Sequence, residues 1–79
     1  MLRLSIAEKL LSLLAGEKIP SSRMRYPEIR EMLAENIIVE VRMGRMKSVY
    51  QLRDQGTLHT YLFTRFGISD LHAYVETLK

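Results

Sequence analysis

Three cationic side chains crowd a short stretch around a glycine near the middle of the chain. They are Arg42, Arg45 and Lys47, and they flank Gly44. Arginine and lysine combine positive charge with hydrogen-bond donors, which is the chemistry that binds phosphate oxygens. Residues 23–53 hold seven basic and four acidic side chains, so this segment accounts for the whole net charge of +3. The distribution favours a polyanionic partner, and a solubilising surface is the alternative.

The rest of the sequence offers little for catalysis or metal binding. The chain has no cysteine, and its two histidines, His59 and His72, lie in different predicted helices without a four-ligand pattern. No nucleophile stands beside a base, and no glycine-rich phosphate loop is present. We therefore expect a binding protein rather than an enzyme, with no catalytic residue, no metal ion and no cofactor.

Length and hydropathy indicate one small domain. The chain has 79 residues, which is enough for a single core but leaves a narrow stability margin without disulfides or metals. No segment reaches the ~20 apolar residues needed to span a bilayer. The apolar N-terminus is interrupted by Arg3, Glu8 and Lys9, which is unlike a secretory leader. We expect one domain over residues 1–79, located in the cytoplasm.

Three helices are predicted in the first half of the chain. Ser5 and Glu8 form a capping-box pattern that predicts the start of the first helix, and Gly16 predicts its end. Pro27 suits the first turn of a later helix, which Asn36 can end in a left-handed conformation. The interval between Gly16 and Pro27 leaves room for a second helix of little more than one turn.

A basic hairpin is predicted directly after these helices. Apolar and polar residues alternate over residues 39–43, Gly44 supplies a turn, and a return strand follows over residues 49–52. We expect the inward face to carry Val39, Val41, Met43, Tyr50 and Leu52.

Two further amphipathic helices are predicted over residues 57–79. Their apolar stripes exceed what one small core needs, so we expect some of these residues to form a symmetric homodimer contact. The alternative is that both helices pack back onto the first helix. The residues expected in the dimer or partner contact are Leu58, Leu62, Phe63, Tyr74 and Leu78.

The order of helix, short turn-helix, helix and basic hairpin over residues 5–53 resembles the winged helix-turn-helix family. The resemblance is carried by Ile19-Pro20-Ser21-Ser22 at the turn, by residues 29–38, and by residues 44–52 as the return strand of the wing. It implies an α+β fold of three helices and a two-stranded wing, here with two extra C-terminal helices. Many members are small bacterial or phage regulators that bind duplex DNA, so the resemblance implies a transcriptional or mobile-element regulator.

In this family the third helix enters the major groove and the wing contacts the minor groove or phosphates. The resemblance therefore implies a DNA-binding role for Arg23, Arg25, Tyr26, Arg30, Ala34, Arg42, Arg45 and Lys47. Glu28, Glu31 and Glu35 lie on the outward face of the same predicted helix and would repel phosphate. A winged-helix module that binds protein instead of DNA is therefore the alternative function.

Overall fold

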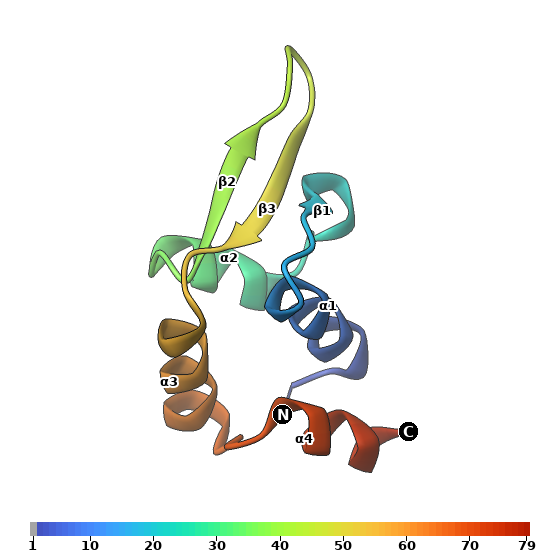
Figure 1. The fold of residues 1–79 in the computed structure, drawn as a ribbon, viewed down its shortest axis with the longest axis vertical. Coiled ribbons are helices and arrows are strands. Elements are labelled where there is room, and N and C mark those ends of the chain that lie inside the picture. Colours follow the sequence, from blue (N-terminus) through green and yellow to red (C-terminus); the bar gives the residue numbers. More distant parts are fainter. Residues whose placement is uncertain (1) are drawn as a thin grey trace.

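The computed structural model describes residues 2–79, which fold into four helices, one short helical turn and a three-stranded antiparallel sheet (Figure 1). The predicted α+β class is confirmed. The elements in chain order are α1 (Leu4–Leu14), β1 (Ile19–Pro20), the 3₁₀ turn η1 (Ser21–Arg23), α2 (Pro27–Ala34), β2 (Ile38–Arg42), β3 (Ser48–Leu52), α3 (Gln55–Phe66) and α4 (Leu71–Leu78).

Left-handed residues end the helices as expected. Gly16, with φ of 91°, follows α1, and Asn36, with φ of 60°, follows α2. The Ile37 amide then donates to the Met32 carbonyl at 2.9 Å, which satisfies a carbonyl at the open end of α2. Residues 15–18 then connect α1 to β1, and residues 35–37 connect α2 to β2.

The helix starts differ from the prediction. α1 begins at Leu4, after an extended Arg3 with no side-chain cap, so the capping box expected at Ser5 is wrong. α3 begins earlier than expected, because Asp54 accepts hydrogen bonds from the Thr57 amide at 2.7 Å and from its hydroxyl at 2.6 Å. These hydrogen bonds from Thr57 lower the pKa of the Asp54 carboxyl.

The sheet has the strand order β1-β3-β2, with β3 in the centre. β1 was not predicted; it pairs Ile19 with Tyr50, which ties the segment after α1 to the hairpin. In the hairpin Ile38 pairs with Leu52, and Glu40 pairs with Tyr50. Directly opposed residues share a face, so Ile38, Tyr50 and Leu52 form the inner face and pack on the core.

The predicted inward face of the first hairpin strand is therefore wrong. Val39 and Val41 lie on the outer face, where Val41 pairs with Val49, and Met43 is exposed. The cause is a shift of one residue, because β2 begins with the buried Ile38 and each step along a strand reverses the side chain.

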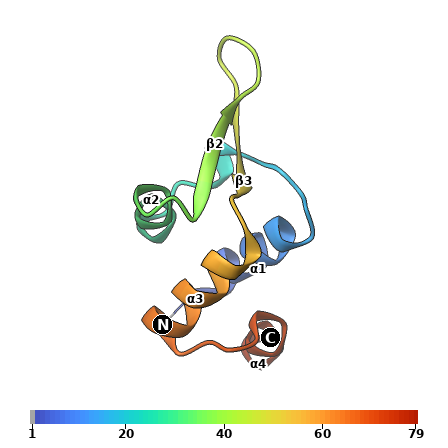
Figure 2. The ribbon, with the colours of Figure 1, turned by 60° about the vertical axis from the view of Figure 1, so that its left-hand side comes forward.

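The core lies below the hairpin, where all four helices meet. Its buried members come from α1, α2, α3, α4, the start of β2 and the intervening loops. Tyr74 of α4 donates its hydroxyl to the Leu2 carbonyl at 2.7 Å and so fastens the last helix to the N-terminus. Figure 1 and Figure 2 show that the hairpin projects from this body, with its tip and α4 at opposite ends of the molecule.

Tyr61 of α3 is buried in this core, with only 6% of its surface exposed. Its ring packs edge-on against Phe66, with ring centroids 6.0 Å apart. Its hydroxyl has no hydrogen-bond partner among residues 2–79. Burial, and then the charge of the nearby Glu31, raise the pKa of Tyr61.

We expect the substitution Tyr61→Phe to leave stability unchanged or to raise it by about 1 kcal/mol, because it removes a buried polar atom without a partner. Tyr74→Phe is the matched control and should lose about 1 kcal/mol, since it breaks a hydrogen bond. Urea unfolding of the three proteins measures the difference. An equal loss in both variants would mean that the Tyr61 hydroxyl has a partner.

The stabilities of the Tyr61→Phe and Tyr74→Phe variants should also differ in their dependence on pH. The raised pKa means that the folded chain holds the Tyr61 proton more tightly than the unfolded chain does. The free energy of unfolding should then fall as pH rises above about 10, the ordinary tyrosine value. Tyr61→Phe should remove this component of the fall, whereas Tyr74→Phe should keep it.

Candidate functional site

Six cations lie on the hairpin, on η1 and its flank, and on α2. All six are exposed, and none forms an ion pair with another residue of the described range 2–79. They are Arg23, Arg25, Arg30, Arg42, Arg45 and Lys47, and we call them the basic surface. Unpaired exposed cations remain available to an anion without the cost of breaking an existing salt bridge.

The first part of the basic surface is held by η1. Met24 is buried between Arg23 and Arg25, so both arginines project into solvent from an anchored segment. The Ser48 hydroxyl donates to the Ser21 hydroxyl at 2.9 Å, which joins η1 to the hairpin at the first residue of β3. The two arginines are therefore positioned by the same strand that carries the hairpin tip.

α2 supplies the next cation, Arg30. Ile29 and Met32 are fully buried, which orients this two-turn helix and leaves Arg30 and Ala34 exposed. Pro27 occupies the first turn, as predicted, and its missing amide proton costs no helical hydrogen bond there.

Glu28 of α2 forms a surface ion pair with Arg3 of the same chain. The Arg3 guanidinium donates to both of its carboxylate oxygens, at 3.0 Å to one and 3.2 Å to the other. This interaction lowers the pKa of Glu28, mainly through the hydrogen bond from Arg3. The sequence contained no local signal for this pair, because Arg3 precedes α1 and is far from Glu28 along the chain.

Glu31 is also paired, with Arg65 near the end of α3. Glu35 is the one glutamate of the three that is exposed and makes no ion pair among residues 2–79. Two of the three carboxylates that oppose phosphate binding are therefore matched by cations of α3 and the N-terminus. The side of α2 that carries Arg30 is left with little uncompensated negative charge.

Tyr26 has a different position from the one predicted. It is half-buried against the core, and two cations lie over its ring, Arg3 at 5.4 Å and Lys9 at 5.8 Å from the ring centroid. The ring therefore serves mainly to join α1 to the start of α2. Tyr26 also lines a shallow hollow with Arg25, Pro27 and Arg30, so it adjoins the basic surface without projecting from it.

The five residues predicted for a dimer contact differ in how exposed they are in the structure. Leu58 and Leu62 are fully buried in the core of the single chain, because α3 packs back on the body, so they cannot meet a partner surface. Tyr74 and Leu78 are half-buried. Phe63 alone among the five is largely exposed, at 64%.

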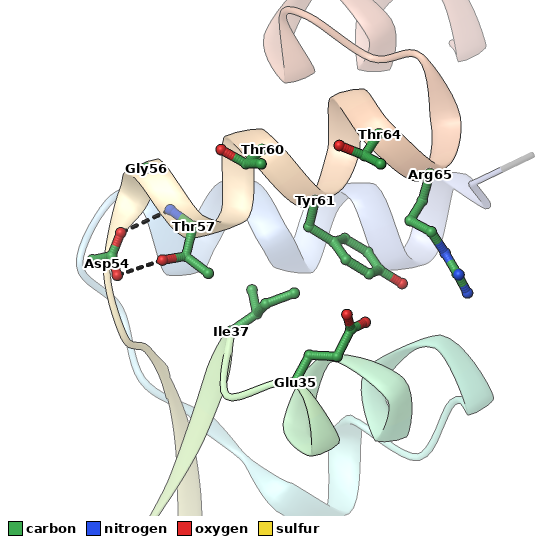
Figure 3. Close-up of a pocket in the computed structure, with 9 residues that line it drawn as sticks. All are labelled: Glu35, Ile37, Asp54, Gly56, Thr57, Thr60, Tyr61, Thr64 and Arg65. Carbon is green, nitrogen blue, oxygen red and sulfur yellow. Dashed lines mark hydrogen bonds between the residues drawn. The ribbon is translucent and has the colours of Figure 1, made fainter.

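A groove runs between α3 and the α2–β2 connection (Figure 3). Thr57, Thr60 and Thr64 line it along α3, and Glu35 and Ile37 line it from the other side. Figure 3 shows the Tyr61 ring directed across the groove toward Glu35. Its hydroxyl itself is covered, and the rest of the polar lining is the threonine hydroxyls, the carboxylates of Glu35 and Asp54, and the Arg65 guanidinium. Because Arg65 is already paired with Glu31, the lining of this groove offers no unpaired cation to an anion.

Residues 2–79 contain neither a cluster of metal ligands nor a membrane-spanning helix. No three His, Cys, Asp or Glu side chains come together there in a way that could hold a metal ion. None of the helices in that range has the length and apolar character required to cross a bilayer.

Comparison with known proteins adds no relative. The chain matches no protein-family model, no curated protein sequence and no solved structure.

Proposed function

We propose that the protein is a winged helix-turn-helix DNA-binding protein that holds duplex DNA against α2 and the β2–β3 hairpin, which acts as the wing. The chain order α1, β1, η1, α2, β2, β3 and the sheet order β1-β3-β2 support this assignment. In the proposal η1 replaces the second helix, and α2 is the recognition helix. α3 and α4 are additions that complete the core.

The observation that carries the proposal is the basic surface, with six exposed cations free of ion pairs within residues 2–79. Affinity for DNA comes largely from cations that replace counterions along the phosphate backbone. The major groove is about 12 Å wide and admits a helix, so Arg30 and Ala34 of α2 would face the base edges. Arg23 and Arg25 would hold one phosphate strand and the wing another.

The pairing of Glu28 with Arg3 and of Glu31 with Arg65 supports DNA over other partners for this face. Unpaired, three carboxylates on a recognition helix would cost about 1 kcal/mol for each close phosphate, even in water. Internal pairing reduces this cost to that of Glu35. A small transcriptional or mobile-element regulator is the role that we propose for such a protein.

The alternative function, a protein-binding module, is favoured by one observation. Phe63 is a large aromatic residue that the fold leaves 64% exposed on α3. Phe63 lies on α3, which carries none of the six cations of the basic surface. In this alternative a protein partner docks on α3, and α2 and the hairpin bind no DNA.

The wing is tested by replacing its three cations together, as Arg42→Gln, Arg45→Gln and Lys47→Gln. We expect weaker binding to duplex DNA and a shallower dependence of log affinity on log salt, by roughly 0.9 for each phosphate that the variant no longer neutralises. Fluorescence anisotropy over a salt series measures both quantities.

The matched control removes three exposed cations elsewhere, as Lys18→Gln, Arg53→Gln and Lys79→Gln. It changes the net charge equally and should leave the salt slope close to that of the parent. If both triple variants bind DNA equally weakly, binding follows net charge and the wing has no special role.

A substitution at Glu35 tests the proposal by raising DNA affinity instead of lowering it. Glu35→Gln should tighten binding to arbitrary duplex at low salt, by up to about fivefold, because it removes the unpaired carboxylate at the end of α2. Adding Glu31→Gln frees Arg65 and should tighten binding further. Glu76→Gln on α4 is the control with the same charge change, and DNA affinity should not respond to it.

A further inference from the structure

The tip of the wing carries apolar side chains that the fold does not use. Met46 is 95% exposed and Met43 is 52% exposed. Both belong to the connection between β2, which ends at Arg42, and β3, which begins at Ser48. Figure 1 and Figure 2 show that this end of the hairpin projects away from the helices. Because Met46 is almost wholly exposed, it contributes little to the packing of this fold and remains available to a partner.

The tip is a closed turn rather than a loose loop. The Met43 amide donates to the Lys47 carbonyl at 2.8 Å, which leaves Gly44, Arg45 and Met46 as the free residues of the turn. Gly44 has φ of 86°, a conformation that glycine adopts without strain. Met46 is therefore presented at the apex by an ordered backbone, so binding of a partner costs less conformational entropy.

Cations surround this apolar apex. Arg45 and Lys47 are its chain neighbours, and Arg42 precedes the turn. With Met46 they line a small hollow against the inner sheet face, beside Ser48 and Glu40. An unbranched apolar side chain flanked by phosphate-binding cations matches a narrow polyanionic groove with apolar surface beneath its floor. The floor of a DNA minor groove carries base edges with hydrogen-bond acceptors, and the apolar faces of the bases lie just beneath, between stacked base pairs, where an inserted apolar side chain can contact them.

We infer that Met46 is an apolar wedge that enters the minor groove, partly unstacks one base step and bends the duplex. This role rests on the proposed function and specifies the DNA that the protein prefers. Apolar wedges of this kind, including methionine, bend duplexes by about 20–90°. Pyrimidine–purine steps such as TA and CA unstack most easily, so the wing selects duplexes that place such a step beneath it. The flanking cations hold the phosphates on either side.

A membrane surface is the other partner that cations around an apolar apex could meet. A single fully exposed methionine offers little apolar surface, and stable attachment to a bilayer needs more than one weak anchor. DNA is therefore the partner that we infer.

The test measures DNA bending, by energy transfer between dyes at the two ends of a duplex with a central TA step. The parent protein should bend this duplex. Met46→Ala should abolish most of the bend and weaken binding roughly tenfold, since it removes buried apolar surface, while the salt slope stays unchanged. Met46→Leu keeps the apolar bulk and should retain the bend. Replacing the TA step of the duplex with a GC step should weaken DNA binding by the parent protein, and should weaken DNA binding by the Met46→Ala variant to a smaller extent.

Other outcomes would overturn the wedge role of Met46, the proposed DNA binding, or both. If the parent binds DNA and the bend is absent, or is equal in Met46→Ala, the wedge is wrong while the proposed function stands. If the parent binds no duplex at low salt, the proposed function fails, and the wedge fails with it. If Met46→Ala leaves DNA binding intact but loses binding to vesicles of phosphatidylserine and phosphatidylcholine, the apex is a membrane contact instead.

Discussion

Burial of Ile29 and Met32 is the constraint that orients α2 and the part of the basic surface that this helix carries. α2 has eight residues, or about two turns, so fixing two of them in the core fixes the direction of every other side chain on the helix. Arg30 and Ala34 are turned to solvent as a consequence. The carboxylates of Glu28 and Glu31 are brought within reach of cations on neighbouring elements by the same packing.

The two C-terminal helices explain how so small a chain supports a projecting hairpin. The second helix of the first half is reduced to η1, which contributes no buried residue of its own. α3 and α4 supply the missing core surface with the buried residues Leu58, Leu62, Leu71 and Val75. α3 and α4 lie toward the end of the molecule opposite the hairpin tip (Figure 1). They leave the tip and the outward residues Arg30 and Ala34 of α2 exposed in the single chain.

Local signals predicted much of this fold. Pro27 at the start of α2 and Asn36 at its end follow from backbone preferences that act within one turn of the chain. The hairpin itself followed from alternation and from Gly44. Local pattern could not predict which face of each strand points to the core, since a shift of one residue reverses every side chain.

Interactions between distant segments were likewise beyond sequence reasoning. The partners Arg3 and Arg65 of the α2 glutamates depend on how separate helices pack. Leu58 shows the same limit, since an amphipathic stripe indicates burial without indicating whether the chain or a partner provides it. Of the predicted functional residues, the cations kept their exposed positions because charge alone keeps a side chain in solvent.

The most direct measurement of the central claim is backbone amide chemical-shift mapping of the ¹⁵N-labelled protein, titrated with a random-sequence duplex at low salt. The account predicts shifts that cluster at residues 23–30 and 42–48 and reverse on addition of salt, with α4 unaffected. The absence of any response, or shifts confined to the surroundings of Phe63 on α3, would contradict it.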